Sequence, residues 1–257
     1  MFDADGNLGA FGKIPALGDF FKRRLPNSFL DPWDAWLRVV MARSRGDLGV
    51  FWLDAFLTSP IWRFVLARDV CGEAAVAGVL MPSVDAVNRH FPLTLANLLP
   101  ASCNPFAVAA AEAWFAQLED LGLACLARRL DPEAIEGHLD GIEGPHIAAT
   151  PLPFVPVQTA DRSTRERSCW PYDPSVPGFL LECLYPAALD EFARRMIGAY
   201  SVWWTTGSDA VEPVVRIFRG LPPDREFASF LTGGCPKSPA ERANLGSPVV
   251  DGANDTA

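Results

Sequence analysis

The chain has 257 residues, of which 49% are hydrophobic and 21% are charged, and its formal net charge is −9. This composition is typical of a soluble globular protein that buries a substantial core. The acidic balance argues against a nucleic-acid partner, because surfaces that track phosphates carry an excess or a stripe of Lys and Arg.

Neither membrane insertion nor secretion is indicated by the sequence. No uninterrupted apolar run reaches the length of a membrane span, and residues 1–12 lack the basic and apolar regions of a secretory signal. The six cysteines form no CxxC pair, so a zinc ribbon or a redox dithiol is not expected. We therefore expect a cytoplasmic protein whose cysteines are mostly small core residues.

Three Asx-Pro pairs predict helix starts, at Asp31-Pro32, Asn104-Pro105 and Asp131-Pro132. An Asx oxygen caps the first free N–H groups of a helix, and proline at the next position has no N–H to leave unpaired.

One long amphipathic helix is expected after Asn104. The spacing puts four residues on one apolar stripe, namely Trp114, Leu118, Leu121 and Cys125. Such a stripe predicts packing on a flat partner, although Gly122 is expected to weaken the second half of the helix.

The flat partner is predicted from short runs rich in Val, Ile, Leu and aromatic residues, bounded by Pro, Gly or Asp. These strands are expected at 61–67, 73–82, 91–100, 201–207 and 214–218, with a last short helix at 226–231. Strands interleaved with helices predict an α/β fold in which helices cover both faces of a mixed, partly antiparallel central sheet.

Both halves of the chain contribute strands, which favours a single domain that spans residues 1–234. Between 144 and 177 the chain is too rich in proline for regular structure and is interpreted as a long excursion from that domain. Residues 235–257 have little apolar content and are expected to form a disordered tail.

Local catalytic and cofactor signatures are missing. The chain has no GxSxG, GxxxxGK[ST] or GxGxxG, and GAFGK at 9–13 lacks the hydroxyl residue that follows the lysine of a phosphate loop. Four potential metal ligands in HLDGIEGPH match no zinc or calcium spacing, which favours a solvated turn: His138, Asp140, Glu143 and His146. We expect no catalytic residue, metal or cofactor.

A polar turn, PSVDAVNRHFPL at 82–93, interrupts two apolar runs. One interpretation is a small hydrolase site that uses Asp85, Arg89, His90 and Asp19. The favoured interpretation is structural, with Asp85 capping the turn and pairing with Arg89.

A second unusual stretch is FGKIPALGDFFKRRLP at 11–26, where Gly18-Asp19 predicts a turn with positive φ at the glycine. The basic cluster at 22–24 is more often a solvated face than a patch that steers an acidic partner. Trp203 and Trp204 are expected to point to opposite faces of a strand, both in the core, although an exposed ring would mark a binding surface.

Five stretches in this order resemble the type VI secretion-associated family called TagF or ImpM. They are GKIPALGDFFKRRLP (12–26), PIWRFVL (60–66), GVLMPSVDAVNRHFPLTL (78–95), SVWWTTG (201–207) and RGLPPDREFASFLTG (219–233). The resemblance covers roughly residues 9–234. It implies a three-layer α-β-α sandwich, in agreement with the fold predicted from the pattern.

The resemblance also implies a function without catalysis. Members of the family are cytosolic post-translational regulators, generally repressors, that bind the forkhead-associated (FHA) scaffold protein of the secretion system. Some relatives are fused to a PP2C-type phosphatase domain, which here would be a separate chain. The residues expected to bind or to shape the site are Lys13, Gly18, Asp19, Asp85, Arg89, Trp203 and Trp204.

We further expect the Gly18-Asp19 turn and the 82–93 turn to meet at one edge of the sheet, where a paired Asp85 and Arg89 fix a recognition surface. Two alternatives stay open: the small hydrolase, and a structural accessory subunit of the secretion complex.

Overall fold

The computed structural model describes residues 8–100, 103–127, 130–145 and 185–234. The predictions for the 144–177 excursion fall almost wholly outside these residues, as do those for the 235–257 tail and for His146.

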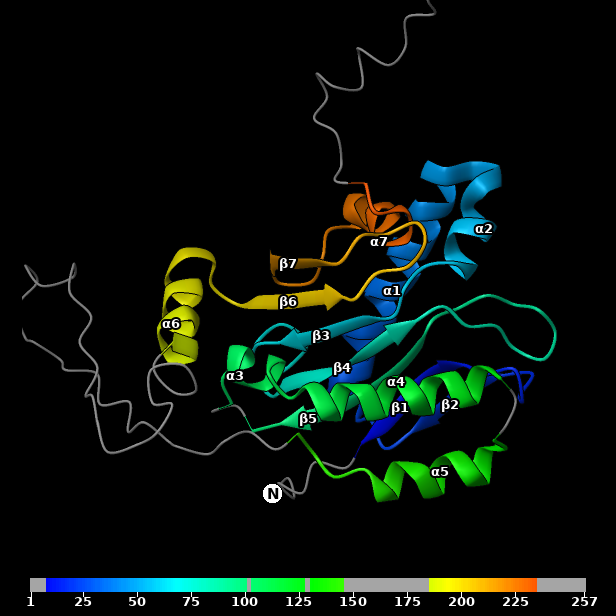
Figure 1. The fold of residues 1–257 in the computed structure, drawn as a ribbon, viewed down its shortest axis with the longest axis horizontal. Helices are drawn as coiled ribbons and strands as arrows, with labels where there is room; N and C mark the ends of the chain where they lie inside the picture. Colours follow the sequence, from blue (N-terminus) through cyan, green and yellow to red (C-terminus); the bar gives the residue numbers. More distant parts are fainter. Residues whose placement is uncertain (1–7, 101–102, 128–129, 146–184, 235–257) are drawn as a thin grey trace, which may run out of the picture.

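The centre of the fold is a seven-stranded sheet with the order β2-β1-β5-β4-β3-β6-β7 (Figure 1). Its strands are β1 Gly9–Lys13, β2 Phe20–Arg23, β3 Trp62–Leu66, β4 Ala75–Met81, β5 Leu93–Leu99, β6 Tyr200–Thr205 and β7 Val214–Arg219. Every neighbouring pair of these described strands is antiparallel. The α/β class is confirmed, but the expectation of a mixed sheet is corrected to an antiparallel one.

Helices cover both faces of this sheet, which gives three layers (Figure 1). One face carries α1 Asn27–Leu48, the 3₁₀ turn η1 Gly49–Phe51, α2 Trp52–Leu57, the 3₁₀ turn η4 Asp224–Glu226 and α7 Phe227–Thr232. The other face carries α3 Pro105–Ala109, α4 Glu112–Leu126 and α5 Pro132–Gly141. Helix α6 Tyr185–Ile197 lies beside α3 and the start of β6.

The alternation of side chains along the strands divides the interior into two cores. In β4, Val76 and Leu80 point toward α1, whereas Ala77 and Val79 point toward α4. The α1-side core is built around Trp33, a fully buried ring whose Nε1 donates to Thr94 Oγ1 at 3.0 Å. Burial on both faces explains why the central strands are almost continuously apolar.

Two of the three predicted helix starts are confirmed. Asn104 Oδ1 accepts from the amides of Phe106 and Ala107 at 2.9 and 3.2 Å, and Asp131 Oδ1 accepts from the amide of Ala134 at 2.7 Å. The Asp31 prediction is wrong, because α1 begins four residues earlier, at Asn27.

The early start of α1 has a packing reason. Phe29 and Leu30 are buried in the α1-side core, so the turn that precedes Pro32 gains more from helical packing than it loses at the proline. Pro32 therefore lies inside the helix.

The predicted long helix after Asn104 is divided. The chain leaves helical geometry at Ala111, where ψ is 60°, so α3 can stack Phe106 on Tyr200 while α4 lies on the sheet. The predicted stripe is confirmed, since Trp114, Leu118, Leu121 and Cys125 are all buried.

Gly122 has a different role from the one expected. A Cβ added there would lie 2.1 Å from Met81 Cε, so the missing side chain lets α4 approach β4 closely.

A buried cation joins β3 to α4. The Arg63 guanidinium binds both carboxylate oxygens of Glu119, at 2.6 and 3.1 Å, and one oxygen of Glu112 at 2.6 Å. These bonds, that of Glu119 above all, raise the pKa of Arg63 in spite of its burial. The ion pairs of Arg63 with Glu119 and Glu112 therefore fix the position of α4 on the sheet.

Replacing Glu119 with Gln should lower the free energy of unfolding by about 1–3 kcal/mol, because the buried guanidinium loses its principal counter-charge. Glu112→Gln is the matched control; it removes a largely exposed carboxylate and should cost less than about 1 kcal/mol. Urea unfolding of both variants measures the difference. Equal costs would contradict the role given to Glu119.

Candidate functional site

The predicted polar turn is organised by the carboxylate of Asp85, which is completely buried. Lys13, the last residue of β1, donates a hydrogen bond to Asp85 Oδ2 and is itself buried. Arg89 Nε donates to the same oxygen at 2.7 Å. The predicted pairing of Asp85 with Arg89 is confirmed, and Lys13 adds a second cation from another strand.

The other carboxylate oxygen of Asp85 shapes the turn itself. It accepts hydrogen bonds from the amides of Val87 and Arg89, at 3.0 and 2.8 Å. Asn88 adopts a left-handed φ of 62°, a conformation that asparagine tolerates better than most residues. All of these bonds are local, so the sequence predicts the turn from its own residues.

The 14–19 loop is attached to this turn. The amide of Ala86 donates to the Leu17 carbonyl at 2.9 Å, and the Arg89 guanidinium donates to the Gly18 carbonyl. The two turns therefore meet as expected, at the ends of β1 and β4 rather than along an edge of the sheet.

Two details of the 14–19 prediction are corrected. Gly18 does not have positive φ and has open space around its Cα, so its contribution is the carbonyl that Arg89 binds. Asp19 is exposed, and its carboxylate accepts from the amide of Phe20 at 2.8 Å instead of joining Asp85.

Electrostatics keeps Asp85 ionised. Burial alone would raise its pKa, but the hydrogen bonds from Lys13, from Arg89 and from the amide of Val87 hold the pKa well below the ordinary value. Asp85 therefore stays negatively charged in the folded protein. Together, Asp85, Lys13 and Arg89 form a clamp that joins β1, the 14–19 loop and the 82–90 turn.

His90 points away from this clamp. Its ring packs edge-on against Trp52 and Phe56 of α2, with centroid separations of 6.2 and 6.1 Å. Burial and the nearby Arg45 lower the pKa of His90, and Asp85 offsets part of this shift. The four residues of the hydrolase prediction are thus divided between an ion-pair cluster, an aromatic contact and an exposed turn.

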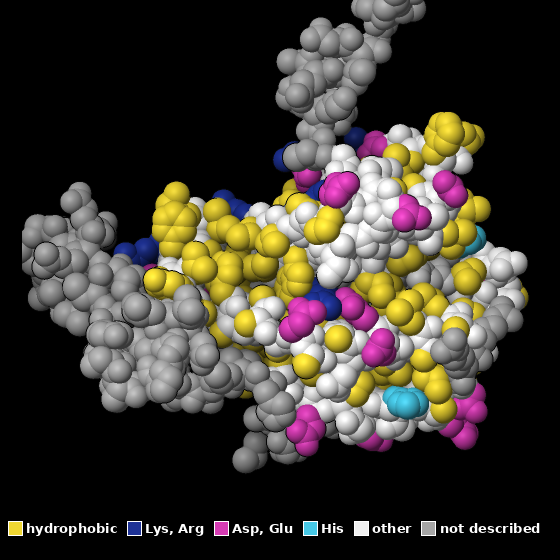
Figure 2. Space-filling view, in the orientation of Figure 1, with side chains coloured by type: hydrophobic (Ala, Val, Ile, Leu, Met, Phe, Trp, Pro, Cys, Tyr) yellow, Lys and Arg dark blue, Asp and Glu magenta, His cyan; other side chains and the backbone are white. Residues whose placement is uncertain are grey.

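Next to the turn lies an exposed hydrophobic surface that sequence reasoning missed. Val50 and Phe51 of η1 are 90% and 74% exposed, and Leu53 and Leu57 of α2 are also exposed. We call these four residues the apolar tip; Figure 2 shows hydrophobic side chains at the upper right, over η1 and α2. The run VFWL at 50–53 could have indicated this surface, because four consecutive apolar residues cannot all face the buried side of a helix.

The segment that carries the apolar tip contacts the turn. Trp52 and Phe56, which lie between the tip residues along the chain, contact His90 of the turn. Val87 of the turn is 62% exposed, and the guanidinium of Arg89 lies at the surface. Apolar side chains are therefore presented beside a fixed cation, an arrangement typical of protein-binding surfaces.

The two predicted tryptophans differ in accessibility. Trp203 is wholly buried and stacks near Trp33 at 6.1 Å, which confirms its expected core position and leaves it no surface for direct contact with a partner. Trp204 is half-buried, on the opposite face, against Phe115 at 4.8 Å.

The predicted basic cluster at 22–24 is largely used within the fold. Lys22 donates to Asn27 at 2.6 Å, while the Arg23 and Arg24 side chains reach Glu136 and Asp140 of α5 at 3.2 and 2.8 Å. These contacts attach α5 to the strand at one edge of the sheet, where charges also discourage further strand pairing.

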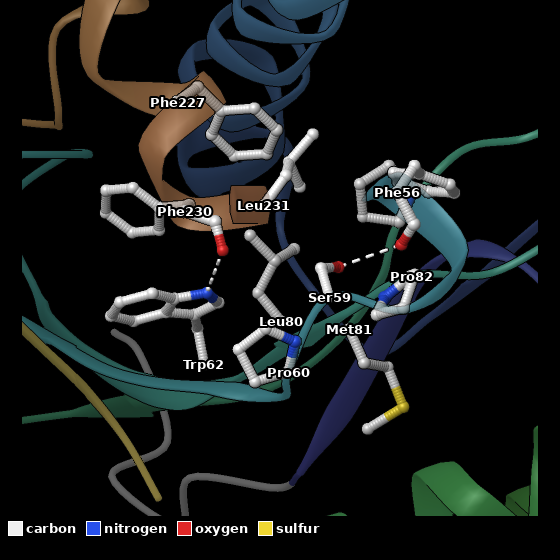
Figure 3. Close-up of a pocket in the computed structure, with 11 residues that line it drawn as sticks. Phe56, Ser59, Pro60, Trp62, Leu80, Met81, Pro82, Phe227, Phe230 and Leu231 are labelled. Carbon is white, nitrogen blue, oxygen red and sulfur yellow. Dashed lines mark hydrogen bonds between the residues drawn. The ribbon is translucent and has the colours of Figure 1, made fainter. Parts of the chain in front are cut away.

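A small pocket opens between α2, α7 and the ends of β3 and β4 (Figure 3). Its lining is mostly apolar, and its polar groups are already paired: Ser59 Oγ donates to the Phe56 carbonyl at 2.9 Å, and Trp62 Nε1 to the Phe230 carbonyl at 3.1 Å. His90 is not among the lining residues. The pocket therefore offers apolar contact rather than groups for acid-base chemistry.

Within 8–100, 103–127, 130–145 and 185–234, no group of three or more His, Cys, Asp or Glu side chains is arranged to hold a metal ion. Over the same stretches, no helix has both the length and the apolar character needed for a membrane span.

Asp85→Asn should lower the midpoint of thermal unfolding by about 5 °C or more, because Lys13 and Arg89 lose their shared counter-charge. A carboxyl group whose pKa is lowered in the folded state stabilises the fold at pH values above its pKa in the unfolded chain, which is about 4 for Asp. This stabilisation is lost progressively as the pH falls below that value. The wild type should therefore lose stability below about pH 4 more steeply than the variant.

Circular dichroism melts between neutral pH and pH 3 measure both effects. Asp19→Asn is the matched control, since Asp19 is exposed and makes one local hydrogen bond. A variant that melts like the wild type at every pH would show that the Asp85 cluster does not hold the two turns together.

Comparison with known proteins agrees with this architecture. The profile of the TagF N-terminal domain, described as type VI secretion system-associated, matches residues 9–142. The 2.05 Å crystal structure of PA0076 from Pseudomonas aeruginosa PAO1 is similar, with a TM-score of 0.72 and 36% sequence identity over 90% of this chain and 97% of that chain. No curated protein sequence matches. The chain therefore belongs to the TagF family of type VI secretion system-associated proteins.

Proposed function

We propose that this protein is a cytoplasmic post-translational repressor of a bacterial type VI secretion system, and that it acts by binding the FHA scaffold protein of that system. The family membership supports the association with type VI secretion. The contact surface in this proposal is the 82–90 turn together with the apolar tip.

The observation that carries the choice of surface is the clamp at Asp85. A buried carboxylate with four donors fixes the backbone beneath Val87 and Arg89, so these side chains need little ordering when a partner binds. A preorganised surface of this kind suits recognition.

The exposure of the apolar tip also supports this choice of surface. Val50 and Phe51 are among the most exposed large hydrophobic side chains in the described ranges, and exposing them to water is unfavourable unless a partner covers them. An aromatic anchor surrounded by smaller apolar residues is the usual centre of a protein–protein interface.

The proposed mechanism needs no chemical step. The Asp85 carboxylate is committed to Lys13 and Arg89, and His90 is packed against aromatic rings, so a binding role fits these side chains better than acid-base catalysis.

Titration calorimetry of the purified chain, produced without kinase, against the FHA scaffold protein of the same secretion cluster tests the proposal. We expect a Kd of about 1 μM or lower. Phe51→Glu should weaken binding by at least about 10-fold, because a charge replaces the apolar anchor. Val87→Glu, in the neighbouring 82–90 turn, should also weaken binding.

Leu123→Glu is the matched control, since Leu123 is an exposed apolar residue of α4 on the other side of the sheet and should leave the Kd unchanged. Failure of the wild type to bind either the unphosphorylated or the phosphorylated scaffold would overturn the proposed function. Full binding by both Phe51→Glu and Val87→Glu would instead overturn the assignment of the surface.

A further inference from the structure

A positive charge lies next to the apolar tip. Arg45, in the last turn of α1, is exposed, and its guanidinium lies over the ring of Trp52, 4.1 Å from the ring centroid. Trp52 directly follows Phe51 of the tip in the chain. The structure therefore holds a cation beside exposed apolar side chains.

Arg45 differs from the other two arginines of α1 in having no carboxylate partner. Arg38 pairs with Asp34 at 2.7 Å and Arg43 with Asp47 at 3.0 Å, each one helical turn away. One turn from Arg45 the chain has Met41 and Gly49, neither of which carries a charge. Among the residues that the structure describes, no acidic side chain forms an ion pair with Arg45.

The ionisable groups next to Trp52 in α2 and in the turn do not cancel this charge. Asp54 is two positions after Trp52, and residues two apart in a helix do not face each other. The ring of His90 contacts Trp52 with a centroid separation of 6.2 Å. Burial, together with Arg45, lowers the pKa of His90, so its ring is mostly neutral at pH 7. The charge at this ring is therefore that of Arg45.

The geometry of the guanidinium favours a carboxylate as its ligand. An arginine that lies over an aromatic ring still has in-plane N–H groups free for a partner, and two of them match the two oxygens of a carboxylate. Phosphorylated motifs are normally bound by clusters of arginines. In the described chain Arg45 is alone at this ring, and the nearby Arg89 is already bound to Asp85 and Gly18.

We propose that the apolar tip binds a segment of a partner protein in which an Asp or Glu lies beside a large apolar residue, with the carboxylate on Arg45 and the apolar side chain against Val50 and Phe51. This inference rests on the proposed function for its choice of surface and adds the chemistry of the partner. Because the whole chain carries −9, an acidic segment is repelled by most of the protein and attracted at Arg45, which favours one docking position.

Peptide selection tests this chemistry without assuming which protein is the partner. A random library of short peptides displayed on phage is panned on the purified full chain. We expect the enriched peptides to carry Asp or Glu beside Leu, Ile, Phe or Trp. Fluorescence anisotropy of the labelled peptides should then show that Arg45→Gln weakens binding by about 10-fold or more, because a charged hydrogen bond is lost.

Arg43→Gln is the matched control. It lies on the same helix and changes the net charge by the same amount, but Arg43 is already bound to Asp47, so peptide affinity should be unchanged. Arg45→Lys keeps the charge and loses the two-pronged geometry, so it should fall between the wild type and Arg45→Gln. Circular dichroism melts check that all three variants are folded.

Calorimetry of the same variants with the FHA scaffold protein separates this inference from the proposed function. If the scaffold binds the wild type, Arg45→Gln should weaken the Kd by about 10-fold and Arg43→Gln should not. A scaffold that binds Arg45→Gln as tightly as the wild type would overturn the inference and leave the proposed function standing. Acidic peptides that depend on Arg45, without any binding of the scaffold, would support the inference and overturn the proposed function.

The selection itself has results that would overturn the inference. These are enriched peptides that lack acidic residues, enriched peptides that bind Arg45→Gln as tightly as the wild type, and a library from which nothing is enriched. A preference for phosphorylated over acidic versions of the same peptides would also overturn it, because one unpaired arginine would then not account for the ligand.

Discussion

The buried ion cluster at Asp85 is the interaction on which the candidate site depends. One carboxylate joins the end of β1, the turn after β4 and, through Arg89, the carbonyl of Gly18. A buried carboxylate is unfavourable without counter-charges and hydrogen bonds; here Lys13 and the Arg89 guanidinium supply the charges, and two backbone amides donate further hydrogen bonds. Loss of the carboxylate would leave the buried ammonium of Lys13 without a counter-charge, so Asp85 is the group that holds the three segments together.

The clamp fixes the turn that lies next to the exposed hydrophobic surface. Apolar side chains at η1 and α2 are exposed, and Trp52 and Phe56 attach that segment to His90 of the turn. The rigid turn thus extends into an apolar surface on the same side of the molecule. In this member of a type VI secretion-associated family, these features support the proposal that the chain acts by binding another protein.

Local patterns predicted most of the fold, and long-range contacts account for what they missed. Short apolar runs bounded by Pro, Gly or Asp located β3 to β7, and Asn104 and Asp131 marked helix starts, because strands and caps depend on neighbouring residues. The i to i+4 spacing also indicated the Asp85–Arg89 pair. The contact of Lys13 with Asp85 spans 72 residues, and the space that Gly122 leaves for Met81 depends on packing between layers. Sequence pattern specifies neither of these contacts.

The central claim is that the 82–90 turn and the apolar tip meet the FHA scaffold. Hydrogen exchange of the chain, free and with the scaffold in excess, tests this claim most directly, because amides covered by a partner exchange more slowly. The account predicts added protection concentrated in residues 49–57 and 82–90, with little change in α4 and α5. Protection confined to other elements, or none in a complex known to form, would contradict it.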